Sequence, residues 1–345
     1  MQFILDYTEK ELKEQFANCG VKGFRVEQVL RALYDGKTFE EINNIPQNEK
    51  DIIKEHFLFD AVSVAFKQQS VDGTIKYALK LFDGNVIEAV VMKYSYGNTL
   101  CLSTQVGCNM GCKFCASSLG GKVRDLSCAE MLGQVQKINC ELGGNLKDRA
   151  ITNIVLMGCG EPLDNFENVC AFIERVNDEK YLNISQRNIS LSTCGLVDKI
   201  YDLAERDYGI NLTVSLHASN DKDRRQIMPI AKAYTIQEVL KATDYYFKKT
   251  GRRIYFEYTL CSGINDKEQN AIELAELLRK RVCHVNVIKL NEVLERNIKG
   301  VSRAKAQEFV KSLNDKGVSA TLRRTLGEDI DGACGQLRRR VMEEL

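Results

Sequence analysis

The chain has 345 residues, of which 44% are apolar and 28% charged, and a formal net charge of +1. This composition supplies a substantial core, suggests roughly two domains at about 150 residues each, and excludes a disordered or fibrous chain. No apolar run approaches the ~18 residues of a membrane span, and the first residues lack the basic start of a secretion signal. We therefore expect a soluble, cytoplasmic protein with no membrane partner.

Thirteen cysteines occur in the chain. Without a secretion signal they argue against a disulfide scaffold, and closely spaced thiols in a reducing compartment are more often metal ligands or catalytic groups. Basic residues form six short groups, each interpreted singly as solvated surface, although local positive charge leaves nucleic-acid binding open. These groups are Arg224-Arg225, Lys248-Lys249, Arg252-Arg253, Arg279-Lys280-Arg281, Arg323-Arg324 and Arg338-Arg339-Arg340.

Short helices and then a hairpin are predicted before the main body. Residues 1–60 are expected to form a helical accessory domain that binds RNA, beginning with a possible capping box of Thr8 and Glu11. Residues 61–95 alternate between apolar and polar side chains, with Asp83-Gly84 as a turn signal. The sequence therefore predicts a β-hairpin extension that leads into the body of the chain.

A repeat of strand followed by helix makes up residues 96–325. This alternation argues for a parallel sheet with helices outside, and six units are too few for a closed eight-stranded barrel of about 250 residues. The sequence predicts an α/β fold with a partial (βα)6 barrel and a C-terminal tail over residues 326–345. The expected strands are 99–104, 153–157, 188–192, 211–216, 253–260, 284–290 and 319–324, and the expected helices are 24–34, 47–57, 166–177, 197–206, 236–248 and 268–280.

Unusual residues follow four successive predicted strands. Gly107-Cys108 follows the first strand, residues 158–162 the second, residues 192–195 the third, and His217 the fourth. In parallel α/β folds the chemistry collects at the carboxyl ends of the strands. One end of the sheet is therefore expected to gather a metal motif, glycines and polar groups.

Three thiols stand close together in the chain, at Cys108, Cys112 and Cys115. A closed structural zinc site needs four ligands, and no fourth ligand stands nearby in the sequence. An iron–sulfur cluster held by three cysteines can offer its fourth iron to a small molecule, whereas electron-transfer ferredoxin sites are fully ligated. The spacing therefore favours a cluster with an open iron over zinc.

The cysteine spacing, with Phe114 before the last cysteine, resembles the radical S-adenosylmethionine (SAM) superfamily, and residues 158–162 resemble its loop for the methionine amino group. In that superfamily the open iron binds the methionine moiety, and the cluster's electron cleaves the sulfonium to give a 5′-deoxyadenosyl radical. The resemblance implies two cofactors, S-adenosylmethionine and a 4Fe–4S cluster held by Cys108, Cys112 and Cys115.

A wider set of segments resembles the RlmN/Cfr adenine methyltransferases over nearly the whole chain. These segments are 101–108, 160–165, 215–218, 225–230 and 329–337. Pro162 favours the RlmN branch, because the Cfr pattern carries alanine there. The resemblance implies a monomeric enzyme that methylates carbon 2 of an adenine in 23S ribosomal RNA, and in some members in transfer RNA, with a flavodoxin or ferredoxin as reductant.

The resemblance also implies a role for individual residues. Carbon 2 of adenine is electron-poor and cannot attack a sulfonium methyl group, so the family uses a radical route with two molecules of S-adenosylmethionine per turnover. Cys334 matches the cysteine that becomes S-methylated, Cys101 the resolving thiol that forms a transient disulfide with it, and Glu88 the proton acceptor. The residues that match S-adenosylmethionine contacts are Gly160, Glu161, Ser192, Ser215, Leu216, His217 and Asn291.

Three alternatives stay open on the sequence. The Cfr branch methylates carbon 8 of a neighbouring adenine with the same cysteines and confers antibiotic resistance. A noncatalytic RNA-binding or zinc-stabilised module leaves Cys101 and Cys334 unexplained, and a generic radical enzyme would carry no methyl group on Cys334. The chain departs from the family pattern at Cys159, Cys194, Gly332 and Leu294, which bears on the shape of the cofactor pocket.

Overall fold

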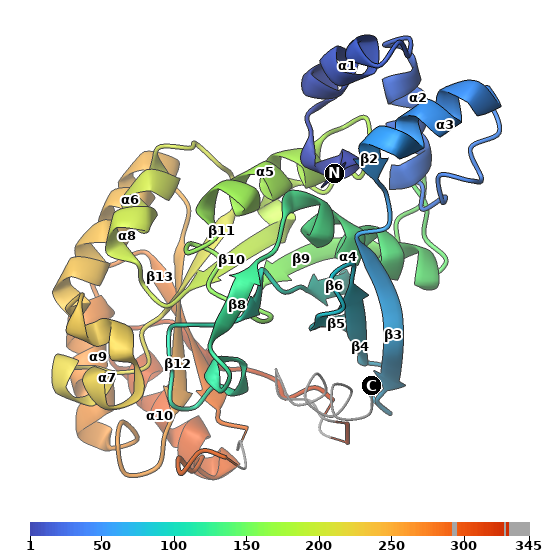
Figure 1. The fold of residues 1–345 in the computed structure, drawn as a ribbon. Helices are drawn as coiled ribbons and strands as arrows, with labels where there is room; N and C mark the ends of the chain where they lie inside the picture. Colours follow the sequence, from blue (N-terminus) through green and yellow to red (C-terminus); the bar gives the residue numbers. More distant parts are fainter. Residues whose placement is uncertain (292–294, 328, 331–345) are drawn as a thin grey trace.

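The computed structural model describes residues 1–291, 295–327 and 329–330. A ten-stranded sheet runs through its centre in the order β14-β13-β12-β11-β10-β9-β6-β5-β4-β3 (Figure 1). Neighbouring strands from β6 to β14 pair in parallel, as the partial barrel requires. The parallel strands are β6 (Gly97–Cys101), β9 (Ile151–Leu156), β10 (Ile189–Thr193), β11 (Asn211–Ser215), β12 (Ile254–Leu260), β13 (Cys283–Lys289) and β14 (Ala320–Leu322).

Helices separate the parallel strands and lie outside the curved sheet (Figure 1). Four predicted helices are confirmed, and each end lies within two residues of the predicted position. They are α5 (Phe166–Asn177), α6 (Val197–Ala204), α8 (Ile236–Thr250) and α9 (Glu268–Leu278). Three others were not predicted: α4 (Cys128–Glu141), α7 (Asp221–Ile227) and α10 (Arg303–Asp315). Within the described part of the chain, no helix is both long and apolar enough to cross a membrane.

The first predicted strand, 99–104, is wrong at its carboxyl end, because β6 stops at Cys101. The Thr104 amide donates to the Cys159 carbonyl oxygen at 2.9 Å, so the chain bonds there to the loop after β9 rather than to a strand. It then forms β7 (Gln105–Gly107), which pairs antiparallel with β8 (Lys122–Asp125). The loop with the three clustered cysteines lies between these two short strands.

The predicted hairpin is larger than expected and belongs to the central sheet. It consists of β3 (Val62–Gln69), β4 (Ile75–Leu81) and β5 (Val86–Tyr94), all antiparallel, with β5 hydrogen-bonded to β6. The predicted turn at Asp83-Gly84 is confirmed, since Gly84 has φ of +85° and the Asp83 carboxylate accepts from the Asn85 amide at 3.0 Å. Residues 61–95 therefore supply three antiparallel strands at one edge of the central sheet.

The N-terminal helices are α1 (Glu9–Asn18), α2 (Arg25–Tyr34) and α3 (Gln47–His56), and the Thr8–Glu11 capping box is confirmed. Short strands β1 (Gln2–Phe3) and β2 (Phe57–Leu58) close this unit. Contacts with α4 and α5 attach it to the barrel: Asp6 accepts from the Ala129 amide at 2.8 Å, and Arg175 donates to the Asp6 carbonyl oxygen at 2.8 Å. The helical unit is thus packed against the sheet's outer helices.

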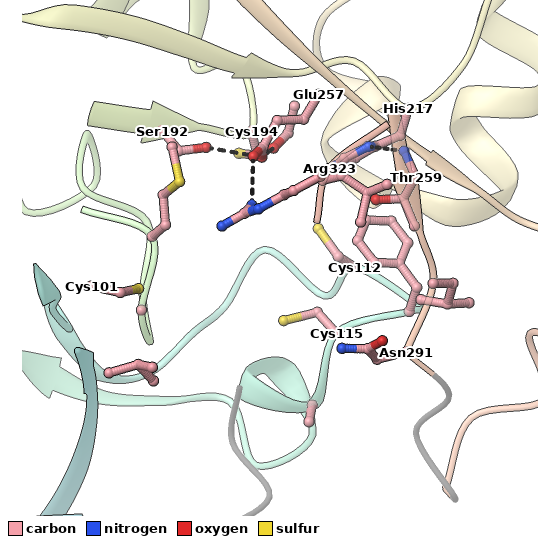
Figure 2. A pocket seen from close by; sticks show the side chains of 18 of the residues that line it. Cys101, Cys112, Cys115, Ser192, Cys194, His217, Glu257, Thr259, Asn291 and Arg323 are labelled. Carbon is pink, nitrogen blue, oxygen red and sulfur yellow. Dashed lines mark hydrogen bonds and ion pairs between the residues drawn. The ribbon is translucent and has the colours of Figure 1, made fainter. Parts of the chain in front are cut away.

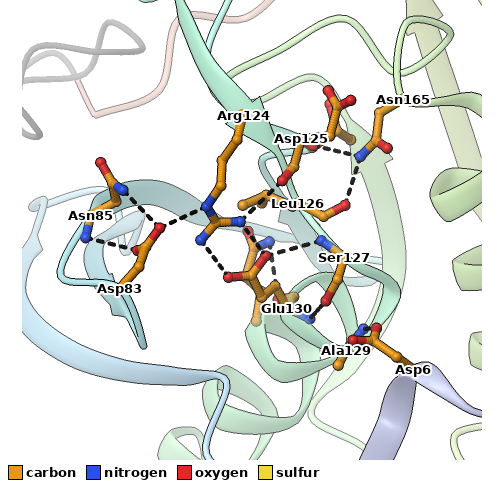
Figure 3. Close-up of polar contacts among 12 residues, drawn as sticks. Asp6, Asp83, Asn85, Arg124, Asp125, Leu126, Ser127, Ala129, Glu130 and Asn165 are labelled. Atoms are coloured by element: carbon orange, nitrogen blue, oxygen red, sulfur yellow. Dashed lines mark hydrogen bonds and ion pairs between the residues drawn. The ribbon is translucent and has the colours of Figure 1, made fainter. Parts of the chain in front are cut away.

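Arg124 connects its own strand, β8, to helix α4 and to the turn between β4 and β5 (Figure 3). Its guanidinium donates to both Glu130 carboxylate oxygens at 2.7 Å, and its Nε donates to Asp83 in the β4–β5 turn at 2.7 Å. Glu130 also completes a capping box with Ser127 at the start of α4, and the hydrogen bond from Arg124 lowers the pKa of the Asp83 carboxyl to about 2. This network fixes β8, and with it the end of the cysteine loop.

We predict that Glu130→Ala lowers the free energy of unfolding by about 2 kcal/mol, because it removes a buried carboxylate that serves both Arg124 and the α4 cap. Chemical denaturation measures the change. Glu308→Ala, at an exposed position of α10, is the matched control and should change the value by less than about 0.5 kcal/mol. Equal effects of the two substitutions would contradict the structural role of Glu130.

Candidate active site

A cavity of about 370 Å³ lies at the carboxyl ends of the parallel strands (Figure 2). Every parallel strand from β6 to β13 contributes residues to its wall. Apart from Glu257 in the middle of β12, these residues lie within one residue of the strand's last residue or in the loop that follows. The cysteine loop, the strands β4 and β5, and residues 323–326 and 330 complete the lining. The predicted convergence of unusual residues at one end of the sheet is therefore confirmed.

Cys108, Cys112 and Cys115 all line this cavity. The Ser118 hydroxyl donates to the carbonyl oxygens of Cys112 and Cys115 at 3.0 Å each, and Arg296 donates to that hydroxyl oxygen at 2.9 Å. Burial raises the pKa of the Cys108 thiol to about 12 and raises that of Cys112 as well. Thiols in so dry a site become thiolates when a positively charged metal centre compensates their charge.

The donor set of three thiols fits an iron–sulfur cluster. Within residues 1–291, 295–327 and 329–330, no three His, Cys, Asp or Glu side chains form a group that could hold a single metal ion. A cluster spreads its cysteine ligands over several iron atoms, so its ligands need not meet at one point. Gly158 and Gly160 line the same cavity as the three thiols.

Two glycines allow the loop after β9 to press against the segment after β6. A Cβ atom on Gly158 would lie 2.6 Å from the Leu102 carbonyl oxygen, and one on Gly160 would lie 2.7 Å from the Gln105 Cβ. Gly160 also has φ of +113°, a conformation that disfavours any side chain. Only glycine fits at these two positions, which explains the glycine pattern read from the sequence.

Glu161 lines the cavity, but its carboxylate holds the surrounding backbone. Its two oxygens accept from the amides of Leu163 at 3.0 Å and Cys194 at 2.7 Å, and burial raises the pKa of the carboxyl. The Glu161 amide in turn donates to the Gln105 side chain at 2.8 Å. Glu161 therefore joins the loops after β9, β10 and β6, and a cofactor contact by this residue stays a prediction.

His217 is buried and neutral in the cavity wall. Its Nδ1 accepts from the Thr259 amide at 2.9 Å, which assigns the proton to Nε2, and burial lowers the pKa of the ring to about 3. The backbone adopts φ of +55°, and Asn265 donates to the His217 carbonyl oxygen at 2.7 Å. The edge-on ring of Phe114 lies 4.9 Å away between centroids. His217 can therefore donate one hydrogen bond, from Nε2, to a ligand.

Ser192 of β10 and Ser215 of β11 each have the hydroxyl oxygen 3.4 Å from the carboxylate of Glu257 on β12. Glu257 is also paired with Arg323 at 3.3 Å. Asn291 lines the cavity as well, so six of the seven predicted S-adenosylmethionine contacts reach it. Leu216 does not, because its side chain is fully buried in the core.

Cys101 and Glu88 belong to the neighbouring strands β6 and β5. Cys101 ends β6, lines the cavity, and has its thiol pKa raised to about 11 by burial. Glu88 does not line the cavity, but Val90, two residues along β5 on the same face, does. Val90 pairs with Cys101 across the two strands. Cys334 lies outside the described residues.

Two supporting residues were missed by the sequence analysis. Arg224, interpreted there as solvated surface, is fully buried and donates to the Cys194 and Leu216 carbonyl oxygens at 2.8 and 3.2 Å. Gln105 is buried between two loops and contacts Glu161. A buried arginine in a short, highly charged helix has no sequence signal that separates it from an exposed one, whereas Gln105 stands three residues before the first cluster cysteine.

The comparisons with known proteins agree with this geometry. Residues 102–275 match the Radical SAM superfamily. A crystal structure of a radical SAM methyltransferase from Sphaerobacter thermophilus is 36% identical, with a TM-score of 0.92 over 97% of this chain and 99% of that chain. Proteins from Clostridium acetobutylicum and Clostridium tetani, each named a probable dual-specificity RNA methyltransferase RlmN, are 47% and 49% identical.

The alignment with the Clostridium acetobutylicum protein covers 100% of this chain and 99% of that protein. The alignment with the Clostridium tetani protein covers 99% of this chain and 97% of that protein. The fold and site thus define a radical SAM enzyme. The chain belongs to the RlmN family of RNA methyltransferases. A 4Fe–4S cluster and S-adenosylmethionine are accordingly its cofactors, and RNA is its substrate.

We predict that His217 makes stability fall at acid pH. Its folded-state pKa of about 3 lies below the ordinary 6.5. Its contribution to the free energy of unfolding is therefore complete above pH 6.5 and declines as the pH falls toward 3. Between pH 7 and pH 5 the free energy of unfolding falls by about 2 kcal/mol for this reason. In denaturation of the cluster-free, reduced protein, His217→Gln should lose about 2 kcal/mol less than wild type over that interval. His56→Gln, at the exposed end of α3, is the control; an unchanged pH dependence in His217→Gln would refute the assignment.

Proposed function

We propose that this enzyme methylates carbon 2 of an adenine in 23S ribosomal RNA, and of an adenine in transfer RNA. The observation that carries the proposal is that Cys101 lines the same cavity as the three cysteines of the loop. A resolving thiol must reach the reacting atoms, and a fully structural cysteine has no need to face the cofactor cavity. The family resemblance alone could not predict this proximity, since only the fold brings β6 and the loop together.

Cys108, Cys112 and Cys115 are proposed to hold the cluster, with S-adenosylmethionine beside it against Gly160, Ser192, Ser215, His217 and Asn291. When bound, these cofactors supply a 5′-deoxyadenosyl radical and a methyl group. The chain's own contribution is to hold the ligand in a cavity whose wall offers a neutral imidazole donor and two serine hydroxyls. Gly158 and Gly160 shape this wall, because they let the loop after β9 pack directly against the segment after β6.

The methyl-carrying cysteine is proposed to be Cys334. Support comes from the tail before it: Leu326 and Ile330 line the cavity, and the Gly327 amide donates to the Asp72 carboxylate at 2.9 Å. The Asp329 carboxylate accepts from the Val71 amide at 3.0 Å, which anchors the same segment to the β3–β4 turn. Four residues of chain reach at most about 14 Å. Cys334 stands four residues after Ile330 in the sequence.

Cys101 is proposed to release the product by forming a transient disulfide with Cys334. A buried thiol is a weak nucleophile, and burial raises the Cys101 pKa to about 11. The nearby Arg323 guanidinium acts in the opposite direction and favours the thiolate. The disulfide must then be reduced by an external agent. We propose that the enzyme works as a monomer in the cytoplasm, with a flavodoxin or ferredoxin as electron donor.

The proposed specificity is tested by the product. Purified enzyme with its cluster is incubated anaerobically with S-adenosylmethionine, a reductant and either ribosomal or transfer RNA, and the nucleosides are analysed by mass spectrometry against synthetic standards. We expect 2-methyladenosine from both RNAs. Exclusive 8-methyladenosine would instead support the Cfr-type alternative, and Cys334→Ala should abolish either product.

We predict that Cys101→Ala accumulates a covalent protein–RNA adduct, because the enzyme can bond to the RNA but cannot release it. Denaturing gel electrophoresis with labelled RNA detects the adduct, and nuclease treatment should remove its label. Cys170→Ala, a buried cysteine on α5 away from the cavity, is the matched control and should release product normally. A fully active Cys101→Ala enzyme without adduct would refute the resolving role.

We further predict that replacing Cys108, Cys112 or Cys115 by alanine removes the cluster. Iron and sulfide content after anaerobic reconstitution, together with the broad visible absorbance of the cluster, measure the loss. The Cys170→Ala control should reconstitute like wild type. Normal iron content with normal cleavage of S-adenosylmethionine in the loop variants would overturn the ligand assignment.

A further inference from the structure

Glu88 is paired with a lysine that no family motif singled out. We propose that Lys76 is a positioning residue for the proton-transfer step: its ammonium group keeps the Glu88 carboxylate ionised and fixed beside the cavity. The inference rests on the proposed function, in which Glu88 accepts the proton from carbon 2 of the adenine. It goes further because it assigns a residue that sets the protonation state of that base.

The two groups form a buried ion pair. Lys76 Nζ lies 3.3 Å from Glu88 Oε2, and the exposed fractions of the two side chains are 1% and 6%. A buried carboxylate without compensation is strongly destabilised and takes up a proton. A neutral carboxylic acid cannot accept the adenine proton. A cation beside Glu88 therefore preserves the form of the side chain that the reaction requires.

Strand register places the pair on the wall that carries Cys101. Val90 of β5 pairs with Lys76 of β4 on one side and with Cys101 of β6 on the other. Residues directly opposite each other share a face of the sheet, and so do residues two apart in one strand. Lys76, Glu88 and Cys101 thus share one face. Lys76 and Cys101 both line the cavity directly.

The lysine serves the transfer without giving up its own proton. The C–H bond at carbon 2 breaks, its electron pair stays with the ring, and the proton moves to a Glu88 carboxylate oxygen. Lys76 keeps its proton and its charge throughout. The carboxylate must lose that proton to solvent before the next turnover, and the adjacent ammonium favours this loss because it favours the ionised form.

Other charged groups face the same part of the cavity from neighbouring elements. Glu257 of β12, Arg323 and Arg324 line it, and the charges of Glu88, Glu257 and Arg323 all act on the Cys101 thiol. On β3 the residue paired with Lys76 is Gln68, which carries no charge. A change in pH dependence must therefore be assigned by comparing variants, since wild type alone contains several titratable groups.

The test uses Lys76→Met in the full-length enzyme with its cluster. The initial rate of 2-methyladenosine formation is measured from about pH 6 to pH 9, beside the methylation of the protein itself, which precedes proton transfer. We expect protein methylation to stay within about threefold of wild type, and RNA methylation at pH 7 to fall about 100-fold. The acid limb of the rate profile should move up by about two pH units or more, so that activity partly recovers at high pH.

Two further variants make the result specific. Lys76→Arg keeps the charge and should restore the wild-type position of the acid limb, while Lys80→Met, at an exposed position of the same strand, should leave rate and profile unchanged. If Lys76→Met loses protein methylation through misfolding, Lys76→Gln replaces it with the same expected shift. Lys76→Met or Lys76→Gln with a wild-type profile overturns the inference.

Failure of the proposed function gives a different result. If wild type makes no 2-methyladenosine, or if Glu88→Gln is fully active, the role of Glu88 as proton acceptor is wrong. If wild type is active, Glu88→Gln is inactive and the neutral Lys76 variants keep the wild-type rate and profile, only the role of Lys76 is wrong. A lower rate with an unshifted profile also counts against the inference, because a merely structural role predicts that outcome.

Discussion

The close contact between the loop after β9 and the segment after β6 determines the shape of the site. Gly158 and Gly160 leave no room for a Cβ atom, so the two backbones meet directly. That contact sets the position of Glu161, whose carboxylate then holds the Cys194 amide of the next loop. Successive strand ends are thereby linked around one cavity. Any side chain at either glycine would separate loops that must lie together for the cofactor to bind.

The second constraint is the dryness of the cavity. His217 is neutral there, burial raises the thiol pKa of Cys101 and Cys108, and the carboxylates Glu88 and Glu257 each have a cation beside them. Buried charges persist when they are paired. A wall of neutral donors and compensated charges suits a cationic sulfonium ligand and a metal cluster that brings its own charge.

The parallel strands, the helices α5, α6, α8 and α9 and the cysteine motif could be predicted from sequence, because strong apolar periodicity and short spacing are local signals. The end of β6 could not be predicted, since Thr104 bonds to a loop more than fifty residues away. The buried position of Arg224 depends on the ends of two strands, β10 and β11, whose carbonyl oxygens accept its hydrogen bonds only in the fold. Proximity of Cys101 to the cysteine loop is likewise a consequence of topology, and the Lys76–Glu88 pair follows from strand register.

The claim that methyl transfer passes through a protein-bound methyl group is tested most directly with S-adenosylmethionine whose methyl group is fully deuterated. The enzyme is first methylated with this cofactor and then turned over on RNA, and the product nucleoside is analysed by mass spectrometry. The account predicts that the new methyl group on carbon 2 keeps two deuterium atoms and gains one hydrogen, because one deuterium is abstracted before the methyl carbon bonds to the ring. A methyl group that keeps all three deuterium atoms would contradict it.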